Sequence, residues 1–301
     1  MKKLYGIICI VISSIGFGIM PVLVKSVYEL GGDTISVIFY KSLFGSVMLW
    51  IFNLITKKPI KLSKDQLKFI IVVGLIGYYP TSFALFEAYN YMPAGAVTTI
   101  HFIYPAIVTT VSYFLYKENI TLLKAIALFL SFFGVFMIVG VGGNISFDVM
   151  GVIFSIASAI TWTIYVLGIA NPLIKDIESS ILAFYLSVIS TIITIGAQPI
   201  IGNINVIIPI KAIIMMVFLT LSSTIIPLVA FGMGVQIIGP GNASILSTLE
   251  LVTSFIAAYL VLGEGVTWQM IIGALLIISA IILLSVQKDE KDESLYLSEK
   301  E

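Results

Sequence analysis

The chain has 301 residues, of which 59% are hydrophobic and only 11% are charged, and its mean hydropathy is +1.12. Soluble domains carry about 25% charged residues, so this composition excludes an ordinary soluble domain and indicates a membrane protein with several spans. Sixteen basic residues balance 16 acidic ones, and all the basic residues are lysine, which argues against nucleic-acid binding. The single cysteine, Cys9, rules out an intramolecular disulfide and a cysteine metal site.

Apolar stretches of helical length follow one another along the chain, separated by charges and turn residues. A helix needs about 20 apolar residues to cross a bilayer. The first stretch is predicted to be retained as a span, because it lacks the small-residue cleavage site of a signal peptide. The first five predicted spans are 4–27, 35–55, 69–88, 95–116 and 122–141. The other five are 149–170, 181–201, 212–234, 243–262 and 267–286. The pattern therefore predicts an all-α membrane protein with ten transmembrane helices.

The lysines predict how these spans are oriented. With a cytoplasmic N-terminus, thirteen of the 16 lysines lie in cytoplasmic segments, and only Lys25 and Lys211 lie in outer loops. Cytoplasmic loops carry an excess of lysine, so both termini are predicted in the cytoplasm and the membrane is predicted to be the cell (plasma or inner) membrane. Residues 288–301 mix charges of both signs with serine and are predicted to form a disordered cytoplasmic tail.

The two halves of the chain resemble each other at a shift of about 145 to 147 residues. The aligned pairs are Phe39-Tyr40 with Phe184-Tyr185, Pro80 with Pro227, Pro93-Ala94-Gly95 with Pro240-Gly241-Asn242, and Leu115-Tyr116-Lys117-Glu118 with Val261-Leu262-Gly263-Glu264. We expect residues 1–145 and 146–287 to form two five-helix repeats. Because five is odd, the second repeat enters the membrane with the opposite orientation. Inverted repeats of this kind recur in secondary transporters, where the substrate site lies near the midplane.

These matched turns, the two glutamates that end spans four and nine, and the aromatic run Trp162 to Tyr165 resemble the EamA-type drug/metabolite transporters over about residues 4–286. The resemblance implies a ten-helix secondary carrier of small metabolites, commonly an exporter of amino acids or related compounds, with a central cavity. Many members carry arginine in the second span, where this chain has Lys41. Lysine keeps the charge of arginine but loses its bidentate geometry.

Three acidic, basic or histidine residues lie more than three residues from either end of a predicted span, where such groups are costly and indicate function by default. Glu250 is a candidate anchor for a substrate amine or a proton-coupling carboxylate; alternatively, it ties helices together. Lys41 is a candidate partner for a substrate carboxylate, unless it extends to the outer interface. His101 is suited to proton coupling or to a substrate hydrogen bond, and equally to a bond between helices.

Aromatic residues and prolines complete the candidate site. Trp162 and Tyr165 share one helix face. We expect a cavity wall from aromatic residues, although each could instead belong to an interfacial belt or to packing. The candidate aromatic residues are Trp162, Tyr165, Tyr78, Tyr79 and Tyr40. Pro80 and Pro227 are predicted to kink the third and eighth spans and to shape or gate the cavity.

The predicted function is secondary transport of small metabolites, with amino acids or their derivatives first and export as the expected direction. The alternative is a proton-coupled exporter of organic cations or amines that uses Glu250. The expected partners are a small-molecule substrate, protons in the alternative, and the lipid bilayer; the sequence does not set the oligomeric state. An enzyme, a scaffold or a receptor is disfavoured, since no nucleotide-binding or hydrolytic motif occurs and the repeat is typical of carriers. We expect no cofactor, no metal site and no catalytic residues.

Overall fold

The computed structural model describes residues 2–92, 94–140, 148–205, 209–262 and 267–286, and these residues form helices and their connections without a strand. The first half contains α1 (Lys2–Glu29), α2 (Thr34–Ile55), α3 (Lys64–Val73), η1 (Gly74–Tyr78), α4 (Tyr79–Tyr91), α5 (Ala94–His101), α6 (Tyr104–Tyr116) and α7 (Leu122–Gly140). The second half contains α8 (Val149–Ile169), α9 (Ser179–Ile201), α10 (Ile210–Thr220), η2 (Leu221–Ile225), α11 (Ile226–Ile238), α12 (Pro240–Leu246), α13 (Leu249–Leu262) and α14 (Trp268–Val286). The predicted tail, 288–301, lies outside the described residues.

Eight helical stretches of the described chain are long and apolar enough to cross a membrane. They are Lys2–Glu29, Thr34–Ile55, Lys64–Tyr91, Ala96–Tyr116, Val149–Ile169, Ser179–Pro199, Ile210–Ile238 and Trp268–Val286. The other two predicted spans correspond to the shorter apolar helix α7 and to the α12–α13 segment. The all-helical membrane fold is confirmed, whereas the exact number of ten crossings stays a prediction.

Polar side chains begin several of these helices at the turns that the sequence predicts. The carboxylate of Asp33 accepts a hydrogen bond from the backbone N–H of Ser36 (2.8 Å), and Asp148 accepts one from Met150 (2.8 Å). Ser63 and Gln66 form a reciprocal capping box at the start of α3. Such caps satisfy backbone donors that have no partner within the helix, and thereby fix where each helix starts.

Two π-helical turns lie at corresponding places in the halves, each directly before one of the prolines predicted to kink a span. In η1, the N–H of Tyr79 donates to the carbonyl of Gly74, and in η2 the N–H of Ile226 donates to Leu221. Proline has no N–H, so the regular hydrogen-bond ladder is interrupted there. A π turn absorbs this irregularity, and such turns are frequent at functional sites.

Two further helices are broken at repeat-related positions. The predicted span 95–116 is interrupted between α5 and α6, directly before the Tyr104-Pro105 pair. The predicted span 243–262 is interrupted between α12 and α13, where Ser247 and Thr248 donate their hydroxyl protons to carbonyls of the preceding turn (2.7 Å each). Proline in the first case, and hydroxyls that compete for backbone carbonyls in the second, explain the breaks.

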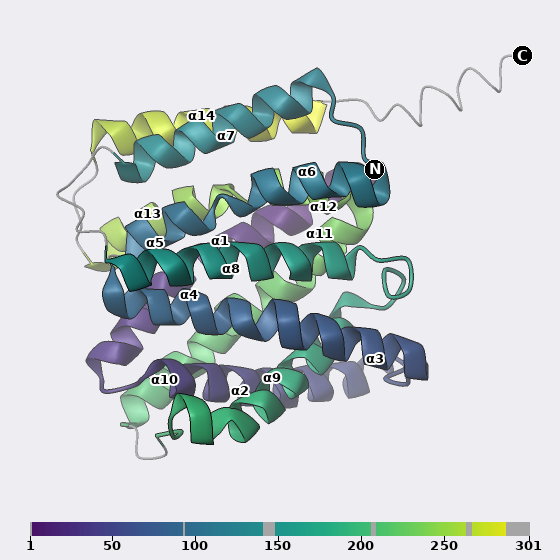
Figure 1. Cartoon of the computed structure of the whole chain (residues 1–301), viewed down its shortest axis with the longest axis vertical. Coiled ribbons are helices and arrows are strands. Elements are labelled where there is room, and N and C mark those ends of the chain that lie inside the picture. The colour runs from purple at the N-terminus through teal and green to yellow at the C-terminus, as the bar shows by residue number, and fades with distance from the viewer. Residues whose placement is uncertain (1, 93, 141–147, 206–208, 263–266, 287–301) are drawn as a thin grey trace, which may run out of the picture.

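The helices of one half pack mainly against helices of the other. Figure 1 shows α7 beside α14 at one edge of the molecule and α2 beside α9 at the opposite edge. Between these pairs, α1 packs on α11 and α13, while α8 packs on α4. Close approach is possible where α8 meets η1 because Gly77 has no side chain: an added Cβ would lie 2.9 Å from the backbone N of Tyr165. The core is therefore the interface between the two halves.

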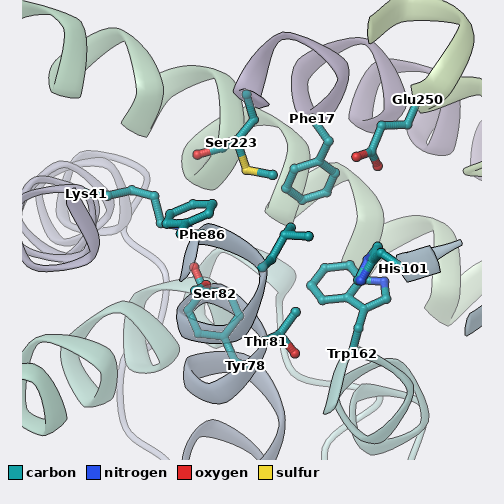
Figure 2. Close-up of a pocket in the computed structure, with 12 residues that line it drawn as sticks. Phe17, Lys41, Tyr78, Thr81, Ser82, Phe86, His101, Trp162, Ser223 and Glu250 are labelled. Atoms are coloured by element: carbon teal, nitrogen blue, oxygen red, sulfur yellow. The ribbon is translucent and has the colours of Figure 1, made fainter. Parts of the chain in front are cut away.

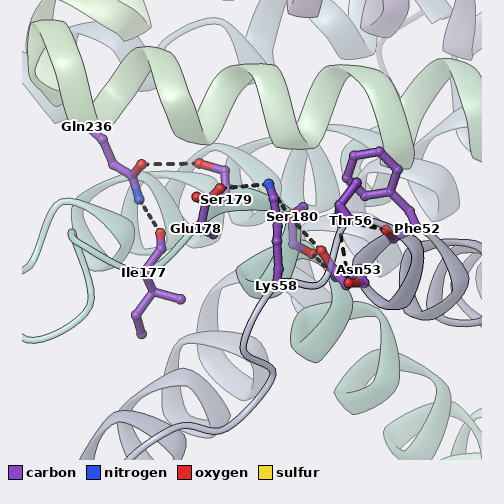
Figure 3. Close-up of polar contacts among 9 residues, drawn as sticks. All are labelled: Phe52, Asn53, Thr56, Lys58, Ile177, Glu178, Ser179, Ser180 and Gln236. Atoms are coloured by element: carbon purple, nitrogen blue, oxygen red, sulfur yellow. Dashed lines mark hydrogen bonds and ion pairs between the residues drawn. The ribbon is translucent and has the colours of Figure 1, made fainter.

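A polar cluster joins the halves at the end of the molecule where α2 and α11 end and α9 begins (Figure 3). Asn53 and Ser180 exchange two hydrogen bonds, Ser180 Oγ to Asn53 Oδ1 (2.7 Å) and Asn53 Nδ2 to the Ser180 carbonyl (3.2 Å). Lys58 pairs with Glu178 at 2.7 Å. Gln236 accepts from Ser179 (3.2 Å) and donates to the carbonyl of Ile177 (2.9 Å). We call this set the Asn53–Ser180 cluster.

Candidate functional site

A cavity lies inside the helical bundle, between the two halves (Figure 2). The first half contributes residues of α1, α2, η1, α4 and α5, and the second half contributes residues of α8, η2 and α13. The lining residues are Phe17, Met20, Lys41, Tyr78, Thr81, Ser82, Leu85, Phe86, His101, Trp162, Ser223 and Glu250. The π turns and the broken helices all reach this cavity, through Tyr78, Ser223, His101 and Glu250. Irregular backbone within a membrane is tolerated where it lines such a space.

The cavity is narrow. The space between its lining atoms, including its open side, is about 460 Å³. Only about 40 Å³ of it can hold the centre of a water molecule, enough for roughly three waters at 10–15 Å³ each. In this conformation the lining residues therefore enclose a small space, and a metabolite requires the side chains to move apart.

Charged groups of opposite sign lie at the two ends of the cavity. Figure 2 shows Lys41, from α2, at one end and Glu250, from α13, at the other. The ion pairs of the described chain join Lys58 to Glu178 and Lys124 to Glu118, so Lys41 and Glu250 have no charged partner there. An unpaired ionisable group inside a membrane protein is costly, which makes both residues candidates for ligand contact.

The surroundings of each charge offset part of this cost. Lys41 is only 3% exposed, and its ammonium lies 5.0 Å from the centre of the Phe86 ring and 5.7 Å from that of Tyr78. Aromatic faces attract cations, and more strongly when water is excluded. Glu250 lies in the first turn of α13. The partial positive charge at a helix N-terminus favours a carboxylate there.

His101 ends α5 on the Glu250 side of the cavity and is fixed by a hydrogen bond. Its Nδ1 lies 2.8 Å from Ser158 Oγ of α8, and that hydroxyl donates to the carbonyl of Ser155 at 2.7 Å. Close by, the Tyr104 hydroxyl contacts Ser247 Oγ, and Ser247 donates to the carbonyl of Ser244 (2.7 Å). Both broken helices are thus tied to neighbouring helices beside the cavity.

An aromatic cluster centred on Trp162 forms one wall. The indole lies 4.7 Å from the ring of Tyr165, 5.4 Å from that of Phe231, and 5.9 Å from that of Phe17, which it meets edge-on. Its Nε1 donor has no hydrogen-bond partner among the described residues. This wall therefore offers a ligand an apolar aromatic face.

Five of the eight predicted substrate-binding residues line the cavity: Lys41, Tyr78, His101, Trp162 and Glu250. The other three do not line it.

Tyr165 is buried behind Trp162. Tyr79 stacks on Phe83, and Tyr40 packs against Phe39 and Phe44. Adjacent residues on a helix point about 100° apart, so Tyr79 and Tyr40 cannot share the direction of Tyr78 and Lys41.

Sequence reasoning missed several lining residues, of which Phe17 and Phe86 matter most for the shape of the cavity. Phe17 aligns with Trp162 between the repeats, and that correspondence was a signal for it. Phe86 lies two turns after Tyr79 in an apolar stretch, and no sequence pattern separates it from packing residues. The predicted gating prolines lie beside the π turns, while their role in gating stays a prediction.

Comparison with known proteins gives matches over nearly the whole chain. The model of the EamA-like transporter family matches twice, over residues 4–140 and 149–286. An uncharacterized transporter of Clostridium kluyveri is 22% identical and aligns with 97% of this chain and 96% of its own. The uncharacterized transporter YvbV of Bacillus subtilis is 26% identical over 70% of each chain.

A solved structure described as "Crystal structure of protein" has the same fold. Its TM-score is 0.75 at 15% sequence identity, covering 95% of this chain and 98% of the other. The likeness is one of fold alone, because the identity is low.

Proposed function

Since this chain belongs to the EamA-like transporter family and is a multi-span membrane transporter of small molecules, we propose that its substrates are small zwitterions, amino acids or their derivatives first. One observation carries this proposal: a lysine and a glutamate, neither with a charged partner among the described residues, line the same cavity at opposite ends. A zwitterion offers each of them a counter-charge, its carboxylate to Lys41 and its ammonium to Glu250. Singly charged metabolites would leave one of the two groups uncompensated.

Alternating access is the proposed mechanism. The two halves form a ten-crossing, inverted pair with both termini in the cytoplasm, and they rock about the cavity so that it opens to one side at a time. The position of the cavity between the halves supports this mechanism, as does the family match to each half in turn. Export is the proposed direction across the cell membrane, although the gradients of substrate set the net flux.

Within the cavity we assign the polar contacts to Lys41, His101 and Glu250 and the walls to Trp162 and Tyr78. Tyr165 supports Trp162 from behind. Tyr79 and Tyr40 are proposed to act only through packing next to these residues. Pro80 and Pro227, with their π turns, are proposed as the places where the third and eighth spans bend.

A proton-coupled exporter of organic cations is the second candidate. Glu250 supports it, because a cavity-lining carboxyl group without a charged partner among the described residues is suited to bind a proton and a cation in turn. Lys41 opposes it, since a fixed cation in the same cavity repels a cationic substrate.

Counterflow in proteoliposomes tests the two candidates with three molecules of one shape: leucine, 3-methylbutylamine and 4-methylpentanoate. The proposal expects exchange of leucine at a rate at least about tenfold above that of the amine or the acid, because each lacks one of two charge contacts worth about 1.4 kcal/mol or more. Imposing a pH gradient should leave leucine exchange unchanged. Accumulation of the amine that follows the pH gradient and disappears in Glu250→Gln would favour the cation exporter instead.

A further inference from the structure

The hydroxyl of Ser158 lies within hydrogen-bond distance of two groups, a backbone carbonyl and the imidazole of His101. Ser158 Oγ donates to the Ser155 carbonyl on its own helix (2.7 Å) and lies 2.8 Å from His101 Nδ1. Both contacts are hydrogen bonds only when the hydroxyl donates to the carbonyl, which cannot donate, and accepts from the imidazole; the reverse arrangement loses the bond to the carbonyl. In the neutral ring Nδ1 therefore carries the proton, and Nε2 holds an open lone pair.

Among the described residues no hydrogen bond to Nε2 of His101 is present, and His101 lines the cavity, which leaves a molecule inside the cavity as the partner for this lone pair. The neighbouring tyrosine does not occupy it. Tyr104 lies 5.1 Å from His101, ring centre to ring centre, but its hydroxyl contacts Ser247 Oγ, whose own proton goes to the Ser244 carbonyl. By the same reasoning Tyr104 donates to Ser247 and has no proton left for His101.

Two hydrogen-bond acceptors thus face the same end of the cavity, the Nε2 atom of neutral His101 and the carboxyl group of Glu250 (Figure 2). Lys41, with donors only, lies at the far end. A carboxylate or phosphate at the His101 end would place acceptors against these acceptors and form no hydrogen bond with them. A primary ammonium group has three N–H donors and can donate to both His101 Nε2 and the Glu250 carboxyl group.

We propose that His101 Nε2 accepts an N–H of the substrate ammonium group beside Glu250, and that Ser158 is the positioning residue that holds His101 in the required tautomer. This inference rests on the proposed function, because it assigns the recognition of the amine within that same site. Ser158 touches the substrate only through His101.

The chain contains one histidine, which makes the tautomer directly measurable. Full-length protein is labelled with [15N]histidine, purified through a histidine-free tag and studied in lipid nanodiscs by NMR. The wild type is expected to show a protonated Nδ1 and an unprotonated Nε2, and leucine should shift the Nε2 resonance. A wild-type spectrum with the proton on Nε2, or an Nε2 resonance that saturating leucine leaves in place, would overturn the proposal.

Transport by matched variants tests the positioning role. Ser158→Ala should raise the half-saturating leucine concentration about fivefold, the typical effect of losing one hydrogen bond, and its spectrum should show the second tautomer. Ser158→Thr keeps the hydroxyl and should retain the wild-type values. Ser155→Ala is the control: it removes a hydroxyl that bonds only to the Gly151 carbonyl (2.7 Å) and keeps the carbonyl that Ser158 uses.

His101→Gln retains an acceptor near the position of Nε2 and should transport leucine better than His101→Asn, which retains only the position of Nδ1. Equal transport by these two variants, or equal losses in Ser158→Ala and Ser155→Ala, would contradict the inference. Failure of the proposed function looks different: the wild type then exchanges no amino acid at all, whatever the tautomer of His101.

Discussion

Two lysines are buried to the same extent and differ in what surrounds them. Lys41 and Lys124 are each 3% exposed. Lys124 pairs with Glu118 at 2.6 Å, and Glu118 also accepts from the backbone N–H of Gly241 in the other half (3.4 Å). Lys41 has the rings of Tyr78 and Phe86 beside it and no charged partner among the described residues. The contact with Gly241 makes Glu118 a link between the halves, and its repeat partner Glu264 lies outside the described residues.

Replacing these two lysines by methionine should change stability in opposite directions. Lys41→Met removes an unpaired buried charge and should raise the thermal unfolding midpoint, with a gain of about 1 kcal/mol or more, while reducing leucine exchange to background. Lys124→Met leaves Glu118 without its partner and should lower the midpoint, at a cost of about 3 kcal/mol. Unfolding of both purified variants in one detergent measures this, and a fall in midpoint for Lys41→Met would contradict the idea that this charge is kept for substrate binding.

At the scale of elements, the approach of α1 to α13 is set by a missing side chain. A Cβ added to Gly18 would lie 2.8 Å from the carbonyl oxygen of Glu250 and closer still to the Thr253 hydroxyl. The Thr253 hydroxyl also donates to the Ser14 carbonyl across the same contact (2.9 Å). The start of α13, which carries Glu250, is therefore positioned directly by α1.

Gly18→Ala should separate these two helices, because backbone cannot yield as a flexible side chain can. We expect a loss of about 1 to 3 kcal/mol, the usual cost of overpacking, and weaker leucine binding through the displaced Glu250. Gly196→Ala on α9 is the matched control, since no atom lies within 4 Å of its added Cβ. Thermal unfolding and leucine counterflow of both variants are the measurements, and equal behaviour would show that the close approach does not matter.

For the whole molecule, alternating access requires the halves to separate at one end while they stay closed at the other. The Asn53–Ser180 cluster links α2 of the first half to α9 of the second at one end of the bundle. Each hydrogen bond contributes only about 1 kcal/mol net, so such a cluster stabilises a closed end and still opens reversibly.

A covalent bond at this cluster should therefore stop transport. In a Cys9→Ser background, Asn53→Cys with Ser180→Cys places two thiols at side chains that are in direct contact. Oxidation should reduce leucine counterflow to background and a reductant should restore it, while each single variant stays insensitive to oxidant. Full counterflow in protein shown to be cross-linked would exclude separation of the halves at this end.

The sequence predicted the helical membrane fold because the signals for it are local. Apolar length, turn residues and the lysine distribution each act within one span or loop, and the internal repeat is visible as a shift along the chain. The π turns, and the α12–α13 break at Ser247 and Thr248, were not predicted, because single hydrogen bonds decide them and leave the hydropathy of the span unchanged.

The sequence predicted the ionisable residues of the candidate site, but it did not distinguish the apolar residues that line the cavity from those that do not. Lys41, His101 and Glu250 stand out in any apolar span, since the bilayer penalises ionisable groups wherever they point. Phe86 and Phe17 resemble lipid-facing residues in the sequence, and Tyr79 and Tyr40 resemble their cavity-facing neighbours. The direction in which a side chain points depends on how its helix is rotated against the others, which hydropathy does not record.

By itself the sequence determined that the chain crosses a membrane as a repeated set of helices and that three ionisable groups lie within it. Only the tertiary structure decided that two charged residues without an ion pair to any described residue share one cavity, and that Ser158, 57 residues away along the chain, lies at hydrogen-bond distance from His101. The physical reason is the separation along the chain of the residues involved. The length of an apolar stretch depends on residues that are adjacent in sequence, whereas a binding site is formed by side chains that packing brings together from both halves.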